Sequence, residues 1–317
     1  MREIGGYLEL DDFVQNEYYK DLIALNSARN AFVYLARAKN ISKVYLPYYL
    51  CDSVSKVCDR ENIIYEFYHT DRMFMPIFEK TLQKNEYLYI VNYYGQITNV
   101  QIKKFKELYN NIIIDNVQAF FEEPVEGIDT IYSCRKFFGV PDGAYLFTDA
   151  KNIDLSTDSS KDRMKHLLGR YESNCASDYY SDFQANDNMF ESLEVMHMSK
   201  ITKNILGAID YNKVIEKRNE NWKLYHSNLK DINKLDLCVT KAPYMYPFYC
   251  ENASEIRKRL IAKKIYIPIL WPNIFEFDNC DIEKDLANNI LPLPCDQRYD
   301  KKDIESVISE LVNYISL

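Results

Sequence analysis

Four polar residues of the sequence stand just after apolar runs that have the character of buried strands. Asp115 follows the run 112–114, and Gln118 comes three residues later. Ser133 and Lys136 follow a second run, "TIY", in the same way. Ligands of a doubly wound sheet bind beyond the carboxyl ends of its strands. We therefore expect a carboxylate and an amine to face one ligand at one edge of a sheet.

A helix start is expected at the same edge. Residues 28–39, "ARNAFVYLARAK", have the apolar spacing of an amphipathic helix, and Ser27 in front of them is a plausible N-cap. The free backbone N–H groups at such a helix start favour a phosphate or another anion. The run "YLYIV" brings Asn92 and Tyr94 to this edge as well. The edge therefore gathers a carboxylate, an amine, aromatic rings and a place for an anion.

This set of groups fits pyridoxal phosphate. The cofactor needs a lysine that holds its aldehyde as a Schiff base, donors around its phosphate and a surface against its ring. It also needs an acidic group that keeps the pyridine nitrogen protonated, because the protonated ring withdraws electrons from the substrate carbon. Asp115, at a strand end, is placed for that task, and Lys136 is the candidate for the covalent bond.

Each of these residues also has a structural interpretation. A lysine in a turn is commonly a solvated surface group, and an aspartate after a strand commonly caps a helix or a turn. Arg298 in "PCDQRY" could receive a substrate carboxylate through two hydrogen bonds, or it could form a structural ion pair. Cys134 is expected to be a small packed residue, since nothing near it marks a nucleophile. The joint order of Asp115 and Lys136 with their polar neighbours favours the functional interpretation.

The elements that must position these residues follow from the hydrophobic pattern. Short apolar runs alternate with helical stretches over residues 22–149, which predicts a mostly parallel sheet with helices on both faces, an α/β fold. The polar stretch 151–200 predicts helices in a long excursion that covers a site. The apolar spacing in 203–229 predicts one long helix. We expect a large domain, 1–202, a connecting helix, 203–232, and a small α+β domain, 233–317.

Composition excludes several classes of protein. Of the 317 residues, 47% are hydrophobic and 27% charged, which is typical of a globular chain. A net charge of -8 does not favour a nucleic-acid-binding protein, which would normally carry an excess of positive charge. Without a long apolar run or the apolar core of a signal peptide, we expect a cytoplasmic protein with no membrane partner. The eight cysteines and four histidines are scattered, which predicts reduced thiols and no metal centre.

The chain resembles the DegT-type sugar aminotransferases, which are fold-type I pyridoxal phosphate enzymes. "VNYYGQ" resembles the family's V-H-x-Y-G-Q segment, and "IIIDNVQAFF" resembles its D-x-x-Q-A segment. "SCRKFFGVPDGAYL" resembles its serine, lysine and glycine-rich segment, and "LNSARNAF" with "LPYYLCDSV" resembles its phosphate loop and following strand. "ILPLPCDQRYDKKDIESVISEL" is similar to its closing L-P-L and final helix. These segments occur in the family's order over nearly the whole chain.

The resemblance implies roles for individual residues. Asp115 would bind the pyridine nitrogen, Gln118 would lie beside the ring, and Lys136 would form the Schiff base. Ser133 would bind the phosphate together with the backbone of Ser27 and Ala28. The ring-stacking aromatic falls near Tyr49 or Cys51, of which only Tyr49 can stack. The candidates on the substrate side are Asn92, Tyr94 and Arg298.

The resemblance also implies a reaction. The chain would transfer an amino group from glutamate to a keto sugar attached to a nucleotide, in surface polysaccharide synthesis. A homodimer is expected because the cofactor site of this fold is completed across a two-fold interface. The chain departs from the family in the short interval between Ser133 and Lys136 and in lacking a recognisable G-x-N-x-R stretch. Two alternatives stay open: another pyridoxal phosphate reaction on a sugar or amino acid, or a degenerate homologue that binds without turnover.

Overall fold

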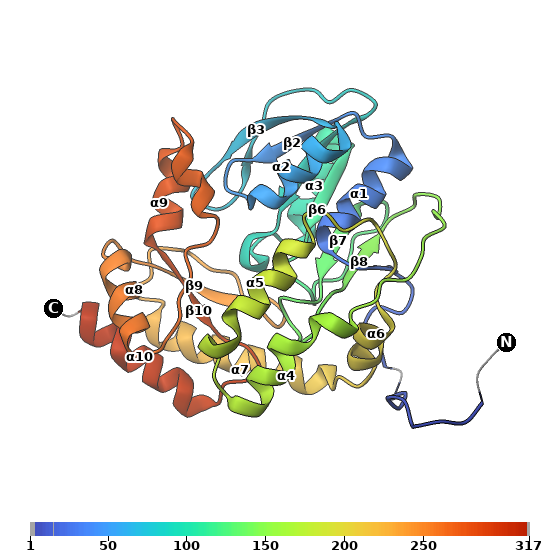
Figure 1. The fold of residues 1–317 in the computed structure, drawn as a ribbon. Coiled ribbons are helices and arrows are strands. Elements are labelled where there is room, and N and C mark those ends of the chain that lie inside the picture. Colours follow the sequence, from blue (N-terminus) through green and yellow to red (C-terminus); the bar gives the residue numbers. More distant parts are fainter. Residues whose placement is uncertain (1–3, 15, 316–317) are drawn as a thin grey trace.

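The computed structural model describes residues 4–14 and 16–315. At its centre lies an eight-stranded sheet (Figure 1). Its strands are β1 (Ile23–Leu25), β2 (Lys43–Pro47), β3 (Ile64–Thr70), β4 (Pro76–Ile77), β5 (Glu86–Val91), β6 (Ile112–Asp115), β7 (Asp129–Ser133) and β8 (Ala144–Phe147). Their order in the sheet is β1-β8-β7-β6-β5-β2-β3-β4. The five strands from β7 to β3 run parallel, while β8 is antiparallel to both of its neighbours.

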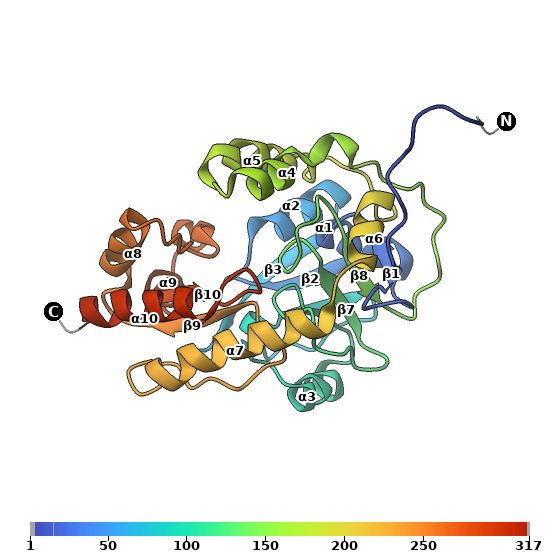
Figure 2. The same cartoon turned by 90° about the horizontal axis from the view of Figure 1, so that it is seen from below.

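Helices cover both faces of the sheet, as the sequence predicts. The first three are α1 (Ala28–Lys39), α2 (Asp52–Glu61) and α3 (Asn99–Tyr109). Figure 2 shows α1 and α2 on one side of the strands and α3 on the other. Alternate side chains of β6 point to the two opposite faces of the sheet. Ile113 packs in the apolar cluster that contains Phe32 of α1. Ile112 and Ile114 pack in the cluster that holds Ile102 of α3. Burial on both faces explains the continuous apolar run before Asp115.

Local capping signals place the helix ends. The hydroxyl of Ser27 accepts a hydrogen bond from the N–H of Asn30 at 3.1 Å, so the predicted N-cap and the helix 28–39 are confirmed. This helix ends at Asn40, whose backbone has a left-handed φ of 52°. Thr98 and Gln101 form a capping box at the start of α3.

The polar stretch after the sheet forms an excursion with two helices, α4 (Lys165–Ser173) and α5 (Tyr180–Met189). Two 3-10 turns, η2 (Lys161–Arg163) and η3 (Ser177–Tyr179), precede them. Figure 2 shows α4 and α5 on the side of the sheet that carries α1 and α2, set apart from the strands. The helices that the composition of this stretch predicts are therefore present.

The connecting segment differs from its prediction. Instead of one helix over 203–229, the structure has α6 (Lys200–Gly207) and α7 (Tyr211–Leu229), so the prediction of a single helix is wrong. The carboxylate of Asp210 accepts a hydrogen bond from the N–H of Lys213 and thereby starts a new helix after the break. Apolar spacing continues across such a break and does not reveal it.

The C-terminal part is the expected small α+β unit. It contains β9 (Met245–Tyr249), α8 (Ala253–Ala262), η4 (Pro272–Glu276), α9 (Asp281–Asn289), β10 (Ile290–Pro294) and α10 (Lys301–Ile315). The strands β9 and β10 pair antiparallel. Trp222 and Tyr225 of α7 pack into the same apolar cluster as Leu291 and Leu311, so α7 shares its core with this unit. Residues 1–3 and 15 of the expected large domain, and 316–317 of the small one, lie outside the described residues.

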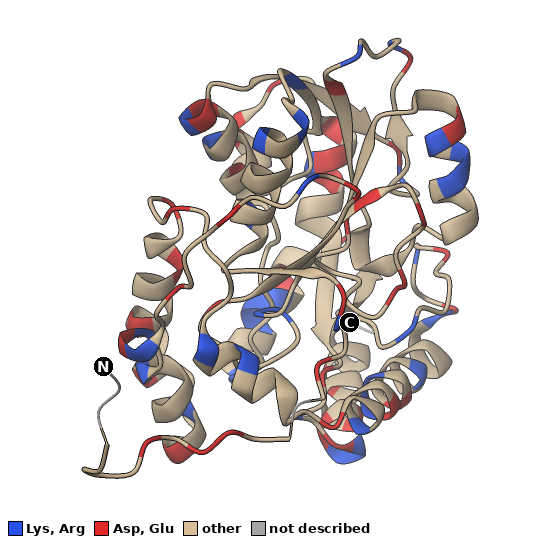
Figure 3. Ribbon diagram, turned by 90° about the vertical axis from the view of Figure 1, so that its right-hand side faces the viewer, with Lys and Arg blue, Asp and Glu red and all other residues tan. Residues whose placement is uncertain are grey.

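The surface carries charges of both signs. Acidic and basic residues are interspersed along the outer helices, and the central strands carry few charges (Figure 3). None of the helices in the described part of the chain is both long and apolar enough to cross a membrane.

Candidate active site

Asp115 ends β6 as a buried carboxylate, with 6% of the residue exposed. One of its oxygens accepts a hydrogen bond from the N–H of Val117 at 2.8 Å, and the other accepts one from the hydroxyl of Tyr89 at 3.0 Å. Burial raises the pKa of Asp115, while the Val117 N–H, the charge of Lys136 and the Tyr89 hydroxyl partly offset the rise. Asp115 is therefore a desolvated carboxylate within the electrostatic reach of the candidate lysine. Sequence reasoning did not single out Tyr89, which reaches Asp115 from the neighbouring strand.

Gln118, three residues after Asp115, contacts Tyr94. The side-chain oxygen of Gln118 accepts a hydrogen bond from the backbone N–H of Tyr94 at 2.8 Å, and Tyr94 has a left-handed φ of 53°. Within the described residues, the Gln118 amide nitrogen and the Tyr94 hydroxyl are buried without a hydrogen-bond partner. Burial raises the pKa of the Tyr94 hydroxyl, and the hydroxyl of Tyr49 adds to the rise, although the two groups lack the geometry of a hydrogen bond.

Unpartnered buried polar atoms are costly. Each one costs about 1–3 kcal/mol when it is left without a hydrogen bond. A bound ligand that offered an acceptor to Gln118 and a partner to Tyr94 would remove this cost. The two side chains therefore fit a site that is completed by a small molecule.

Lys136 lies in the turn after β7, half-buried. Its ammonium lies 5.5 Å from the centre of the Tyr244 ring, a cation–π contact. Among residues 4–14 and 16–315 it has neither a hydrogen bond nor an ion pair. The turn itself is held in place, because the carbonyl of Phe137 accepts hydrogen bonds from Gln297 at 2.8 Å and Arg218 at 3.3 Å. A fixed loop thus presents an unpaired amine.

The residues of the predicted anion site lie where three strands meet. Ser133 of β7 pairs with Ala144 of β8, which pairs with Leu25 of β1, so the loop after β7 and the start of α1 lie at one edge. The Ser27 hydroxyl caps Asn30, and the first-turn N–H groups, among them that of Ala28, have no partner within the helix. Ser133 is buried, with 7% exposed.

One glycine is needed to bring the lysine loop to this place. Gly143 has a left-handed φ of 114°, and a Cβ there would come within 3.2 Å of Cys134 and 3.0 Å of Thr202. Its N–H donates to the carbonyl of Asn26 at 2.8 Å, and its carbonyl accepts from the N–H of Cys134 at 3.0 Å. Gly143 therefore joins the segment before α1 to the lysine loop. Cys134 is fully buried, as expected of a packed residue.

A cluster of charges that sequence reasoning missed borders the same edge. Asp187 of α5 pairs with Arg29 at 3.2 Å and with Arg135 at 2.9 Å. The Arg135 guanidinium also lies 4.6 Å from the centre of the Phe190 ring. Burial lowers the pKa of Arg135, and the charge of Asp187 opposes that effect. The excursion is therefore fastened to the start of α1 and to the residue before Lys136.

Two candidates have their side chains engaged elsewhere. The Tyr49 ring stacks on Tyr93, with centres 5.4 Å apart, and meets Trp271 edge to face at 4.6 Å. One face of Tyr49 is therefore covered by protein. Asn92 uses its amide nitrogen and oxygen in hydrogen bonds of 3.0 and 2.8 Å to neighbouring loop residues. Both side chains help to build the loops that surround Tyr94.

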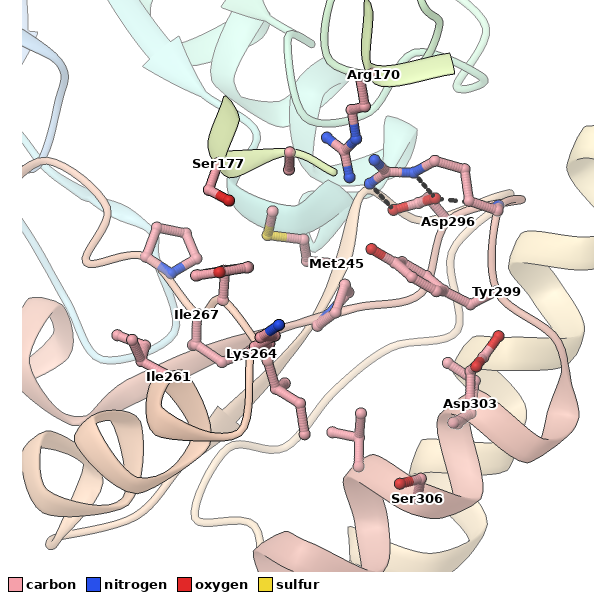
Figure 4. Close-up of a pocket in the computed structure, with 18 of the residues that line it drawn as sticks. Arg170, Ser177, Met245, Ile261, Lys264, Ile267, Asp296, Tyr299, Asp303 and Ser306 are labelled. Atoms are coloured by element: carbon pink, nitrogen blue, oxygen red, sulfur yellow. Dashed lines mark hydrogen bonds and ion pairs between the residues drawn. The ribbon is translucent and has the colours of Figure 1, made fainter. Parts of the chain in front are cut away.

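Arg298 forms the ion pair that its structural interpretation predicts. Its guanidinium binds both oxygens of Asp296, at 2.7 and 2.8 Å. It lines a cavity of about 780 Å³ between the excursion and the small unit (Figure 4). Cations and aromatic rings are prominent in the lining, among them Arg170, Lys264, Arg298, Tyr180, Tyr266 and Tyr299.

This cavity adjoins the lysine without including it. Asp115, Gln118 and Lys136 are not in its lining, but Met245 is, and Met245 follows Tyr244, the ring under the Lys136 ammonium. In Figure 4, Arg170 extends from α4 toward Asp296, opposite the residues of the small unit. The cavity is therefore a neighbouring space that a large substrate could fill.

Comparison with known proteins identifies the fold. No protein-family model and no curated protein matches the sequence. Solved structures do match it. A DegT DnrJ EryC1 StrS aminotransferase from Brucella abortus has 15% identity and a TM-score of 0.61, with 92% of this chain and 85% of that chain covered. NtdA from Bacillus subtilis, with bound cofactor PMP, has 12% identity and a TM-score of 0.65, over 95% and 74%. DesV from S. venezuelae has 13% identity and a TM-score of 0.64, over 92% and 84%.

The chain has the fold of these aminotransferases. The likeness extends over more than nine-tenths of the chain in all three comparisons. The predicted fold class, fold-type I with a mostly parallel sheet and a small C-terminal α+β unit, is therefore confirmed. At identities of 12–15%, the likeness establishes the fold and leaves the reaction to be argued from the site.

Proposed function

We propose that this protein is a pyridoxal phosphate-dependent aminotransferase that acts on a sugar. One observation carries the proposal: a buried carboxylate, Asp115, lies within the electrostatic reach of Lys136, and among the described residues the lysine has no ion partner and the buried polar atoms of Gln118 and Tyr94 have no hydrogen-bond partner. Structures of the same fold support it, because NtdA was crystallised with PMP and Spr1654 from Streptococcus pneumoniae has PLP and PMP forms.

The residues present fit the cofactor. Its phosphate would lie at the start of α1, against Ser27, Ala28 and Ser133, where the N–H of Ala28 has no partner within the helix. Its ring nitrogen would face Asp115, and the Gln118 amide nitrogen would donate a hydrogen bond beside the ring. When bound, the cofactor supplies the electron sink that stabilises negative charge on the substrate carbon.

The protein's own groups then have defined tasks. Asp115 is desolvated and held by the Val117 N–H, and its negative charge would keep a proton at the ring nitrogen, because an opposite charge nearby favours the protonated form. Lys136 would hold the aldehyde through its amine and, when that amine is free, would take up and release a proton at Nζ. Its position over Tyr244 keeps the amine beside the substrate space without an ion partner that would hold it away.

Tyr49 has a limited part in this proposal. Because Tyr93 covers one face of its ring, Tyr49 would contribute to the cofactor site through its free surface and its contact with Tyr94. Asn92 supports the same loops.

The cavity supports a sugar nucleotide as the acceptor. Its aromatic side chains suit a planar base, and Arg170 and Lys264 suit phosphate groups, while Arg298 is already paired with Asp296. The proposal also includes glutamate as the amino donor, a homodimer, a cytoplasmic location and a role in surface polysaccharide synthesis, as the family resemblance implies.

The test uses the purified chain reconstituted with pyridoxal phosphate. We expect a yellow absorbance band, a borohydride-fixed adduct that peptide mapping places on Lys136, and bleaching of the band when glutamate is added. A band and adduct without any response to amino donors would instead indicate a binding homologue without turnover. An adduct on another lysine would refute the site.

A further inference from the structure

Three side chains of different chemistry meet at the junction between the large sheet and the small unit. His69 lies in β3, Cys280 immediately precedes α9, and Glu283 lies in the first turn of α9. One ligand atom from each residue lies within 4.8 Å of the other two. We propose that this cluster binds a zinc ion. The inference is independent of the proposed aminotransferase function.

The types of the ligand atoms point to zinc. In proteins, zinc is bound by three kinds of ligand atom: imidazole nitrogen, thiolate sulfur and carboxylate oxygen. These atoms lie about 2.0–2.3 Å from the ion. Ligand atoms around one such ion lie about 3–4 Å apart, so the cluster needs only small side-chain shifts to close around it. The thiol argues against magnesium and calcium, which prefer oxygen ligands alone.

The carboxylate is held in place before any ion binds. Glu283 has 1% of its side chain exposed, and one of its oxygens accepts a hydrogen bond from the backbone N–H of Thr70 at 2.9 Å. The same oxygen lies 3.0 Å from Nδ1 of His69. Within the described part of the chain its second oxygen has no hydrogen bond, so it is available as a ligand. Such preorganisation lowers the cost of binding.

The other two ligands flank this carboxylate. The Cys280 sulfur is buried, and its hydrogen bond is to the carbonyl of Asp278 at 3.3 Å, a weak contact that an ion would replace. The His69 side chain is 44% exposed, and its ring packs against Tyr48 with centres 4.8 Å apart. The exposed side of His69 leaves a fourth position open to water, so the ion can exchange with solvent.

The simpler explanation is that His69 and Glu283 form an ion pair and nothing more. In that case Cys280 would contribute only packing, and its conservative replacement would change no metal-dependent property. A zinc site makes the opposite prediction, because the thiolate is then a ligand. An ion there would fasten α9 of the small unit to β3 of the large sheet.

The experiment uses the full chain, stripped with a chelator and titrated with zinc and, separately, with cobalt(II). We expect one equivalent of zinc and, for cobalt, the near-ultraviolet band of a cobalt–thiolate bond together with the strong visible absorption of a four-coordinate ion. Cys280→Ser should remove the thiolate band and weaken zinc binding at least about 10-fold. His69→Ala and Glu283→Gln should weaken binding as well, and Gln keeps an acceptor for the Thr70 N–H.

A matched control is the exposed Cys238, which lies outside the cluster. Cys238→Ser should keep the band and the affinity of the unchanged chain. Circular dichroism identifies variants that fail to fold, and Cys280→Ser, as the mildest change, decides the test. If the unchanged chain gives no thiolate band, or if the band and the affinity survive Cys280→Ser, the proposal is overturned.

Discussion

Replacing Asp115 by Asn separates stability from catalysis at this site. Asn keeps the shape of the side chain, its oxygen can still accept from the Val117 N–H, and its amide can donate to the Tyr89 oxygen. The substitution therefore removes a buried negative charge without removing a hydrogen bond. In the cofactor-free protein this charge is compensated only in part, since burial outweighs the charge of Lys136 and raises the pKa of Asp115.

The sign of the effect follows from the direction of that pKa shift. When folding raises the pKa of a carboxyl group, the group contributes stability below its unfolded pKa and loses that contribution as pH rises through its folded pKa. The Asp115→Asn variant should therefore be as stable as the unchanged chain near pH 4 and more stable than it at pH 8. Removing a desolvated charge at 6% exposure should raise the free energy of unfolding by about 1–2 kcal/mol. The melting temperature would rise by about 1–2 °C per kcal/mol, since the entropy of unfolding grows with chain length.

Thermal unfolding of both proteins without cofactor, from pH 4 to pH 8, measures this difference. With cofactor bound, the variant should convert it with glutamate at least about 10²-fold more slowly, because the ring nitrogen loses its charged partner. A variant that is less stable than the unchanged chain at pH 8 would refute the electrostatic argument. A variant that converts the cofactor at the unchanged rate would refute the role of Asp115 in the reaction.

Three further substitutions test the rest of the site. Lys136→Ala should abolish the borohydride adduct and slow conversion by glutamate about 10²- to 10⁴-fold, with circular dichroism unchanged. Asp187→Ala removes the ion partner of Arg29 and Arg135. The free energy of unfolding in urea should fall by about 1–3 kcal/mol, toward the lower value because the ion pairs are partly exposed. An unchanged urea midpoint would contradict this expectation. Tyr94→Phe removes an unpartnered buried hydroxyl, so the cofactor-free protein should be unchanged or about 1 kcal/mol more stable, while cofactor or substrate binding measured by calorimetry weakens.

Local patterns were enough to predict many of the elements and to propose the central residues. The helix 28–39 with its Ser27 cap depends on contacts within four residues, and the structure has the same bounds. The apolar run before Asp115 predicts a strand buried on both faces, because each of its alternate residues must be apolar to meet a layer of helices. The parallel order of β5, β6 and β7 then places Asp115 and the loop of Lys136 at one edge.

Contacts between distant segments could not be predicted in this way. Asp187 meets Arg29 across 158 positions, and Glu283 meets the N–H of Thr70 across 213. The spacing of residues within one segment does not predict its partner in the other segment, because such pairs depend on how whole elements pack.

Sequence alone thus determined the fold class, the Ser27 cap and the candidates Asp115 and Lys136, because each of these depends on local periodicity and on the order of strands. Tertiary structure alone decided that Tyr89 reaches Asp115, that Arg298 is already paired with Asp296, and that one face of Tyr49 is covered. The physical reason is that a side chain's partner is chosen by close packing and desolvation among elements that the chain brings together only when it folds.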